Sequence, residues 1–405
     1  MKQEISLKLQ KTRSLTLIFL SLTLILSMST WFSATSVLPQ LREGWNLSPG
    51  SSAWLTIAVQ IGFVVGSLIS TLVNLSDILS PMTMILAGSL GSAIVNLPLL
   101  WVDDISLGIV LRFSTGFFLV GVYPPAFKLI ATWFRKGRGM ALGVLAAALV
   151  LGNGIPHLVN GLGGLDWHVV IYTTSALSLL GGLIALILVK VGPFPFPKAE
   201  FNPGQIGHIL KNRGVRLAIL GYIGHMWELF AVFAWFSTFY KEVLRVGGIT
   251  DGGKSALATF TLFMAGSLGC WAGGLISDRR GRANTAMMML AISGACSLLI
   301  GLLIGAPSWI VLLVGLIWGF SVVADSAQFS TLVTELADQS YVGTALTLQL
   351  AMGFAVTVVT IWVIPILQEM VGWQWAFAFL VPGPIVGMLS MFRLKKIGKS
   401  IGKRI

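Results

Sequence analysis

Three charged side chains lie inside long apolar stretches of this sequence, where charge is rarely found. Arg112, Glu228 and Asp325 each interrupt a mostly apolar run. A charge at bilayer depth costs about 2.5 kcal/mol or more, so such residues are candidates for ion binding, proton transfer or fixed ion pairs. For Arg112 the sequence leaves three roles open: an anion-binding or coupling cation, an ion pair with Glu228, or a cap on backbone carbonyls.

The buried carboxylates are candidates for carrying a coupling proton. Glu228 follows His225 by about one helical turn, so the two side chains share a helix face. A carboxylate beside an imidazole at low dielectric can exchange protons near neutral pH. Asp325, with Gln328 one turn later, is a second carboxylate candidate. We therefore predict proton coupling through Glu228, His225 and Asp325.

Uncharged polar and aromatic side chains in the same apolar stretches are candidates for contact with a solute. Asn153 and His157 lie one turn apart and can donate hydrogen bonds into a cavity or bind a neighbouring helix. Trp227 can line a cavity or face lipid. With Arg112, the predicted substrate-binding residues are Trp31, Thr35, Gln60, Asn153, His157, Trp227 and Gln328.

The composition places these residues in a membrane protein. Of 405 residues, 55% are hydrophobic and only 10% are charged, and the mean hydropathy is +0.87. A soluble protein of this length needs more charge to cover its surface. The apolar runs are continuous, which excludes the alternating pattern of an outer-membrane barrel. The net charge of +12 comes from basic residues at the ends of the apolar runs, so it does not indicate nucleic-acid binding.

The apolar runs predict an all-α integral membrane protein with twelve transmembrane helices in two pseudo-symmetric six-helix bundles. A polar, proline-rich interruption at 192–213 predicts a linker between an N-terminal bundle at 1–191 and a C-terminal bundle at 214–405. The predicted helices lie at roughly 14–41, 51–75, 81–101, 104–132, 137–161 and 167–190, and at roughly 214–240, 253–277, 283–304, 307–335, 341–368 and 372–393.

The distribution of basic residues predicts the orientation. If the N-terminus is inside, most of the 27 lysines and arginines fall in cytoplasmic segments, which is the positive-inside pattern. We expect a multi-pass protein of the bacterial inner membrane with both termini in the cytoplasm. The first apolar run is too long for a cleaved signal peptide, so we interpret it as the first helix.

The two halves resemble each other in sequence. Gly66-Ser67-Leu68 recurs as Gly266-Ser267-Leu268, and Gly116-Phe117 recurs as Gly319-Phe320. Ala141-Leu142 and Trp167 in the first half have counterparts in Ala345-Leu346 and Trp373 in the second. These matches keep their order at a spacing of roughly 200 residues, which indicates a duplicated six-helix unit. Parallel repeats around a central site are a transporter architecture that supports alternating access.

One loop carries a family resemblance. From Gly274 to Arg282 the chain reads Gly-Leu-Ile-Ser-Asp-Arg-Arg-Gly-Arg, which resembles the signature loop of the major facilitator superfamily. The resemblance implies a conformational latch formed by Asp278, Arg279 and Arg282. The corresponding first-half loop keeps Asp77 but has no arginine, so we expect the latch to depend on the second half.

Helix 4 carries a second resemblance, through Arg112-Phe113, Gly116, Gly121 and Tyr123-Pro124-Pro125. It resembles the helix 4 motif of the superfamily, whose buried arginine is often linked to proton coupling. Within the superfamily the chain is loosely similar to nitrate/nitrite and cyanate-type porters. The nitrate porters use an arginine pair in helices 2 and 8, which this sequence lacks, so nitrate is disfavoured.

The sequence therefore predicts a secondary active transporter, a proton symporter that moves a small polar solute, preferably an organic or inorganic anion, by alternating access. Its partners would be the solute, a coupling ion and the lipid bilayer, without nucleic acid, and it could act as a monomer. No Walker loop, HExxH or nucleophile elbow is present, so we predict neither an enzyme nor a cofactor nor a metal site. Two alternatives are an exporter of amphipathic drugs and a non-transporting membrane sensor or assembly partner.

Overall fold

The computed structural model describes residues 2–73, 75–134, 138–163, 166–194, 203–338 and 341–400, and all regular secondary structure in these ranges is helical. Twelve helices are long and apolar enough to cross a membrane. The first half contains α1 (Lys2–Ser27), α2 (Ser33–Ser36), α3 (Leu38–Gly44), α4 (Pro49–Leu72), α5 (Leu75–Ile78), α6 (Pro81–Asn96), α7 (Ile105–Leu119), α8 (Tyr123–Ala131), α9 (Arg138–Leu162) and α10 (Trp167–Leu188), with 3-10 turns η1 (Met28–Thr30) and η2 (Leu97–Trp101).

The second half follows a short segment with η3 (Pro203–Gln205). It contains α11 (Ile206–Lys211), α12 (Arg213–Val246), α13 (Gly252–Arg280), α14 (Arg282–Leu299), α15 (Ser308–Ala324), α16 (Ser326–Leu336), α17 (Val342–Val371), α18 (Trp373–Ala376) and α19 (Pro382–Ser400), with 3-10 turns η4 (Ile300–Leu303) and η5 (Phe377–Leu380).

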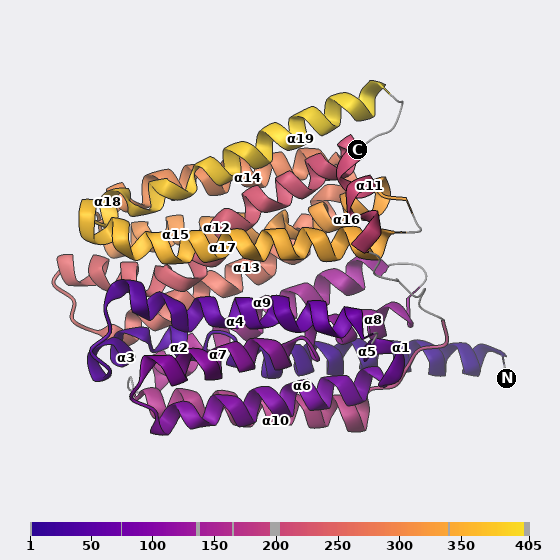
Figure 1. Ribbon diagram of the computed structural model, residues 1–405, viewed down its shortest axis with the longest axis horizontal. Coiled ribbons are helices and arrows are strands. Elements are labelled where there is room, and N and C mark those ends of the chain that lie inside the picture. Colours follow the sequence, from indigo (N-terminus) through magenta and orange to yellow (C-terminus); the bar gives the residue numbers. More distant parts are fainter. Residues whose placement is uncertain are drawn as a thin grey trace.

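The helices form two bundles that lie side by side, α1–α10 and α12–α19 (Figure 1). The bundles meet along a surface that we call the seam, where α9 packs against α13 and α4 packs against α17. The start of α1 and the end of α19 lie at the same end of the molecule, which we call the termini end; α3 and α18 lie at the opposite, far end (Figure 1). The exact boundary at 192–213 stays a prediction, since residues 195–202 lie outside the described part.

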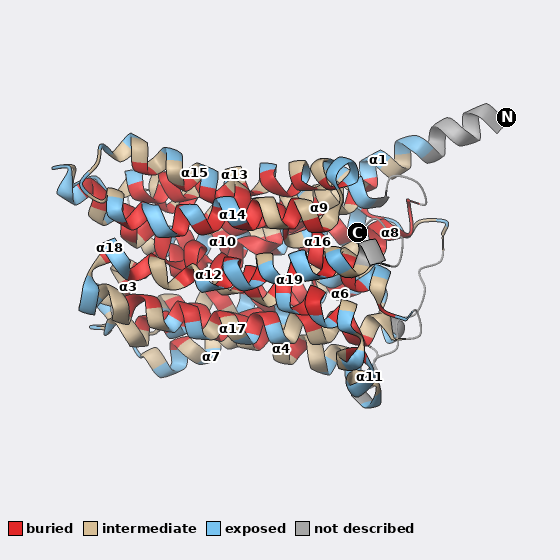
Figure 2. Ribbon diagram, turned by 90° about the horizontal axis from the view of Figure 1, so that it is seen from above, coloured by how far each residue is buried: buried red, intermediate tan, exposed pale blue. Residues whose placement is uncertain are grey.

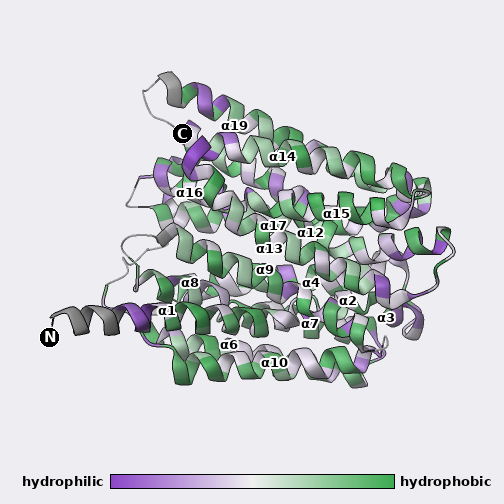
Figure 3. Ribbon diagram, turned by 180° about the vertical axis from the view of Figure 1, so that it is seen from behind, coloured by the Kyte–Doolittle hydropathy of each residue, from purple (hydrophilic) through white to green (hydrophobic). Residues whose placement is uncertain are grey.

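Burial and hydropathy follow the pattern expected of a bundle in lipid. Buried residues face the interior of the molecule, and exposed residues cover its outer faces and ends (Figure 2). Many exposed residues on the outer faces are large and apolar, among them Leu186, Leu268 and Trp271. Hydrophilic residues gather at the two ends, while the middle is mainly hydrophobic (Figure 3). The chain is therefore a multi-pass membrane protein.

All twelve predicted helices correspond to spans, but the first, fourth, tenth and twelfth are broken, the twelfth at η5 and Val381. The predicted helix at 14–41 stops at Ser27 and continues as η1, α2 and α3. Its hydroxyl-rich stretch compensates the break, because Ser29, Thr30 and Ser33 each donate to a carbonyl three residues earlier. The fourth span breaks at 120–122, before prolines that occupy the first turn of α8, where no N–H is needed. The tenth breaks at Asp325.

Glycines let the helices of each bundle approach closely. A Cβ on Gly116 of α7 would overlap the carbonyl oxygen of Val59 in α4, and a Cβ on Gly62 of α4 would overlap that of Phe113. Small residues at both crossing points therefore bring α4 and α7 into backbone contact, as is common in membrane helix pairs. This contact fixes the position of α7, which carries Arg112.

Candidate functional site

Arg112 is fully buried and bonded to the broken first span. Its Nη1 donates to the carbonyl of Thr30 at 3.0 Å and to Ser33 Oγ at 2.9 Å, and its Nη2 donates to the carbonyl of Trp31. Its Nε donates to the carbonyl of Leu55 at 3.2 Å. A broken helix leaves carbonyls that need donors at membrane depth, and the guanidinium supplies them. Of the three roles left open by the sequence, this geometry corresponds to a carbonyl cap.

The network around Arg112 extends away from the seam. Asn96 Oδ1 accepts from Arg112 Nη1 at 3.2 Å and from Ser33 Oγ at 2.7 Å. The amide nitrogen of Asn96 donates to Thr174 Oγ1 and Ser175 Oγ on α10. The charge of Arg112 is therefore held among neutral acceptors inside the first bundle, with no carboxylate within ion-pair distance in the part of the chain that the structure describes.

Glu228, on the first span of the second bundle, is bonded within its own bundle. Its Oε1 accepts from the indole Nε1 of Trp318 on α15 at 2.6 Å, and its Oε2 accepts from Ser293 Oγ on α14 at 2.8 Å. The side chain is fully buried. Glu228 thus joins the first, third and fourth helices of its bundle, and the bridge to Arg112 considered from the sequence is not formed in this structure.

His225 lies beside Asp325 rather than beside Glu228. Its Nδ1 is 2.8 Å from Asp325 Oδ1, and both side chains are only 1% exposed. The distance is that of an ion pair, although the ring is turned so that neither nitrogen makes a well-aligned hydrogen bond. Asp325 lies at the break between α15 and α16, and the rings of Tyr222 and Phe329 pack on the imidazole. The pair therefore joins α12 to a point where the tenth span bends.

An aromatic cluster fills the centre of the seam. Trp31 contacts Phe63 of α4, Phe230 of α12 and Phe354 of α17, with ring centroids 5.1, 6.0 and 6.1 Å away. Phe63 and Phe354 also contact each other at 5.5 Å. Aromatic rings from both bundles thus meet at the level of the break in the first span, where a solute could stack against them.

Five of the predicted binding residues carry buried polar atoms without a hydrogen-bond partner in the described part of the chain. Four of them, near the seam, are Trp31 (Nε1), Gln60 (Nε2), Asn153 (Oδ1) and His157 (both ring nitrogens), and the fifth is Gln328 (Oε1). These four are at most 5% exposed; Gln60 lies on α4, Asn153 and His157 lie on α9, and Trp31 lies in the turn between η1 and α2. Gln60 Oε1 accepts from Thr357 Oγ1 across the seam, and the His157 ring stacks on Phe263 of the other bundle at 5.6 Å.

The other predicted binding residues make their hydrogen bonds inside a single bundle. Thr35 and Thr56 hydroxyls share a hydrogen bond of 2.8 Å between α2 and α4. Trp227 donates to the carbonyl of Phe379 at 3.1 Å. Phe379 lies in η5, so this bond joins α12 to the last span of the same bundle. Gln328 Nε2 donates to the carbonyl of Gly273 at 3.3 Å, and its Oε1 has no partner among the described residues.

A cavity of about 250 Å³ opens in the half of the molecule toward the termini end. Its walls come from α4, α8 and α17, and Phe63 and Phe354 of the aromatic cluster belong to its lining. The other lining side chains are mostly apolar or hydroxyl-bearing, with Lys128 as the one cation. Ligand sites typically measure about 300–1,000 Å³, so this space suits a small solute.

At the far end, α9 and α13 are in close contact, while an open cleft lined by Pro39, Arg42 and Glu43 of α3 and by Thr238 and Lys241 of α12 lies elsewhere between the bundles. A Cβ on Gly161 of α9 would lie 2.7 Å from Leu257 Cγ and 3.1 Å from the carbonyl oxygen of Gly253, both at the start of α13. Toward the termini end, Ser267 Oγ of α13 donates to the carbonyl of Ala147 in α9 at 2.8 Å. The α9–α13 side of the seam is therefore in contact along its length, and the cavity lies on the α4–α17 side.

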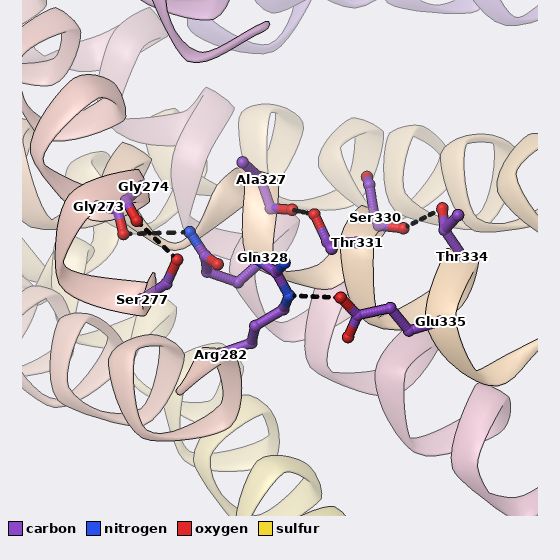
Figure 4. A network of polar contacts seen from close by, with 10 residues as sticks. All are labelled: Gly273, Gly274, Ser277, Arg282, Ala327, Gln328, Ser330, Thr331, Thr334 and Glu335. Atoms are coloured by element: carbon purple, nitrogen blue, oxygen red, sulfur yellow. Dashed lines mark hydrogen bonds and ion pairs between the residues drawn. The ribbon is translucent and has the colours of Figure 1, made fainter. Parts of the chain in front are cut away.

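The predicted latch lies at the termini end, between α13 and α14. Arg282 Nε donates to Glu335 of α16 at 2.9 Å, beside the bond from Gln328 to Gly273 (Figure 4). Asp278 and Arg279 are exposed, and Arg282 pairs with Glu335 rather than with Asp278. The side chain of Asp77 lies outside the described residues. The ion pair therefore ties the loop between the second and third helices of the second bundle to the fourth.

Sequence reasoning missed several residues of these networks. Asn96, Ser293 and Trp318 are polar groups in apolar runs, so a signal for them was present. Phe63, Phe230 and Phe354 had no such signal, because the chain contains 23 phenylalanines and nothing distinguishes these three. Among the described residues, no group of three or more histidine, cysteine, aspartate or glutamate side chains could hold a metal ion.

Comparisons with known proteins agree with this architecture. The sequence model of the Major Facilitator Superfamily matches residues 20–360. The chain is 26% identical over 230 residues to the MFS transporter asaE of Aspergillus flavus, covering 55% of this chain but only 49% of that relative. It is 24% identical over 294 residues to an uncharacterised MFS-type transporter, YceJ of Bacillus subtilis, covering 69% and 70% of the two chains.

Solved transporters share the fold at low identity. A bacterial homologue of the human lysosomal transporter Spinster, inward-facing and occupied, aligns with a TM-score of 0.73 at 14% identity, covering 95% of this chain and 97% of that one. A variant of the nucleoside transporter NupG aligns with a TM-score of 0.73 at 14% identity, covering 94% and 99%. With twelve spans in two bundles and a family match over most of its length, this chain belongs to the Major Facilitator Superfamily and is a membrane transporter.

Proposed function

We propose that this protein is a proton-coupled secondary transporter of the bacterial inner membrane, with its substrate site at the seam and its termini end in the cytoplasm. The observation that carries the proposal is the set of unpaired, buried polar atoms on Trp31, Gln60, Asn153 and His157. Buried polar groups are normally paired, so unpaired ones between two bundles are best explained by a ligand that binds there in another state. Basic residues at the termini end support the orientation.

The His225–Asp325 pair supports proton coupling. An imidazole held 2.8 Å from a carboxylate places a proton donor and a proton acceptor side by side, as a proton carrier requires. Asp325 lies at the break between α15 and α16, where a change in helix angle would separate it from α12. Glu228, by contrast, is bonded to Trp318 and Ser293, which supports a role in holding its bundle together.

The position of Arg112 bears on the class of substrate. All three guanidinium nitrogens donate to oxygens of the first bundle, and the side chain is fully buried away from the cavity. An inorganic anion would need to displace these bonds. The aromatic seam instead supports an organic solute, moved inward as a symporter or outward as an exporter of amphipathic compounds.

The cavity and the α9–α13 contact at the far end support alternating access. A cavity toward the proposed cytoplasmic end, together with contact between Gly161 and Leu257 at the far end, is the arrangement expected of a state open inward. Transport requires a second state in which the far end parts and the cavity closes. The two-bundle architecture allows this change as a rigid-body rotation about the seam.

The test is proton movement in proteoliposomes loaded with a pH-sensitive dye. Small organic solutes that are anionic, cationic or uncharged are added one at a time, with protein-free liposomes as the control. A solute-dependent proton flux that requires the protein is the expected result. If the folded protein moves no protons with any solute, proton coupling is contradicted, and a uniporter or a non-transporting sensor becomes the better interpretation.

A further inference from the structure

The cavity on the α4–α17 side of the seam is elongated and has an aromatic end. Phe63 of α4 and Phe354 of α17 line this inner end, where both rings also contact Trp31. Because α4 follows α3 and α17 leads into α18, the lining continues toward the termini end along later residues of α4 and earlier residues of α17 (Figure 1). The lined part of α17, from Gly343 to Phe354, is about 17 Å long at 1.5 Å per residue. Such a space suits a solute with two chemically different ends.

The end of the cavity away from the rings carries a positive charge. Lys128 lines it from α8, five residues after Tyr123, whose ring stacks on Phe63 with the centroids 6.1 Å apart. Along α8, Lys128 therefore lies about 7–8 Å beyond this pair of rings. Ser67 and Ser70 of α4 line the same cavity, and their hydroxyls can donate hydrogen bonds to an anion.

No acidic side chain is among the described residues that line this cavity. Glu228 and Asp325, the two carboxylates buried at membrane depth, make their contacts inside the second bundle. A cation in the cavity would meet Lys128 without a compensating carboxylate, whereas an anion would gain a charge-assisted contact. The lining therefore favours negative charge at one end of the solute.

The rest of the wall is mainly apolar. Val64 and Leu68 of α4 and Leu350 of α17 lie between the charged end and the rings. A solute with an aromatic ring would cover this apolar surface and pack against Phe63 and Phe354. A short hydrophilic anion would leave the same surface uncovered, so charge alone does not satisfy the cavity.

We infer that the cavity binds an aromatic acid whose carboxylate contacts Lys128 and whose ring lies against Phe63 and Phe354. The inference rests on the proposed function and deepens it by naming the substrate class. The carboxylate accepts from the ammonium group of Lys128 and from the hydroxyls of Ser67 and Ser70. The offset of about 7–8 Å along α8 favours a short chain between ring and carboxylate, as in an arylalkanoate, over a carboxylate attached directly to the ring.

Matched probes test the charge and the ring. Phenylbutyrate, phenylbutyramide and phenylbutylamine, each with the ring on the terminal carbon, are anionic, uncharged and cationic, and hexanoate carries the negative charge without a ring. Binding is measured by isothermal titration calorimetry on the full-length protein in a non-ionic detergent, with protein-free micelles as the blank. Phenylbutyrate should bind about tenfold more tightly, or better, than each of the other three.

Variants test the location. Lys128→Gln removes the charge at a similar length and should weaken phenylbutyrate binding about tenfold or more, while phenylbutyramide changes by less than about threefold. Lys128→Arg keeps the charge and should retain most of the affinity. Phe354→Leu should weaken phenylbutyrate about threefold to tenfold without weakening hexanoate. Lys190→Gln, at an exposed lysine after α10, is the matched control and should leave binding unchanged.

The outcomes separate the inference from the proposed function. An amide or amine that binds as tightly as the acid would overturn the substrate class, and this comparison uses the wild-type protein, so it stands even if Lys128→Gln does not fold. Phenylbutyrate binding that Lys128→Gln leaves unchanged would overturn the site. Proton flux is measured separately. An acid that binds without evoking proton movement would support the substrate class and contradict proton coupling, whereas proton movement evoked only by uncharged or cationic solutes would do the reverse.

Discussion

His225 Nδ1 lies 2.8 Å from Asp325 Oδ1, and each side chain is only 1% exposed. The two residues come from α12 and from the break between α15 and α16, so their contact depends on how the tenth span bends. Neither ring nitrogen of His225 has a well-aligned partner among the described residues, so the pair is not held by a rigid network. We propose that proton binding at this pair is coupled to the angle between α15 and α16.

The carbonyl-cap role of Arg112 predicts a stability effect. Arg112→Met keeps an apolar side chain but removes the guanidinium bonds to the carbonyls of Trp31 and Leu55 and one of the two side-chain bonds to the carbonyl of Thr30, which Ser33 Oγ still donates to. Unsatisfied buried groups cost about 1–3 kcal/mol each, so we expect a loss of about 3 kcal/mol or more, seen as a lower thermal midpoint in detergent. Arg245→Ala, at a 70% exposed arginine, is the control and should leave the midpoint unchanged. A midpoint unaffected by Arg112→Met would contradict the cap.

The close crossing of α4 and α7 predicts opposite effects of two alanine substitutions. At Gly116 a Cβ would overlap the carbonyl of Val59, so Gly116→Ala should destabilise the protein by about 1–3 kcal/mol. At Gly143 of α9 no atom lies within 4 Å of the Cβ position, so Gly143→Ala should be neutral or stabilise by about 0.5–1 kcal/mol. Thermal unfolding monitored by tryptophan fluorescence measures both, and similar midpoints for the two variants would argue against this packing.

Alternating access predicts that a bond across the far end stops transport. Cysteines at Gly161 and Leu257 would be close enough to bridge, since a Cβ on Gly161 lies 2.7 Å from Leu257 Cγ. The buried Cys270 and Cys296 are first replaced by alanine to avoid wrong pairing. Oxidation should abolish solute flux in proteoliposomes, and reduction should restore it. Full transport by the oxidised protein would mean that the far end need not open.

The Arg282–Glu335 pair predicts a charge-swap effect at the termini end. Both residues are partly exposed, so the pair contributes only about 0–1 kcal/mol to stability. If the loop helps to set the balance between two states, Arg282→Glu and Glu335→Arg should each slow transport several-fold. The double variant restores an ion pair and should recover much of the rate. A double variant as slow as its parents would show that the pairing itself is unimportant.

Much of the fold was predictable because a helix that crosses the bilayer needs a run of about 20 apolar residues. Twelve apolar runs of sufficient length gave the twelve spans, and the halves were indicated by recurring motifs such as Gly66-Ser67-Leu68. The helix breaks were less predictable. Prolines at 124 and 125 marked one of them, whereas the break at Asp325 has no proline or glycine beside it.

The candidate site was predictable as a set of residues but not as a set of contacts. Burial of Arg112, Glu228 and Asp325 followed from their apolar surroundings. Their partners did not, because helical periodicity relates residues on one helix only. His225 and Glu228 share a face by spacing, yet the former meets α15–α16 and the latter meets α14 and α15, a difference set by how three helices pack.

The most direct test of the account compares two kinds of flux in proteoliposomes, using a solute that evokes proton movement with the wild-type protein. His225→Phe and Asp325→Asn should reduce solute-driven proton flux at least tenfold while exchange of labelled solute across the membrane continues. Glu228→Gln should retain proton flux, because the amide can keep both contacts. Its oxygen can accept from Trp318 Nε1, and its NH2 group can donate to Ser293 Oγ. Undiminished proton flux in both His225→Phe and Asp325→Asn, with loss only in Glu228→Gln, would contradict coupling through the His225–Asp325 pair.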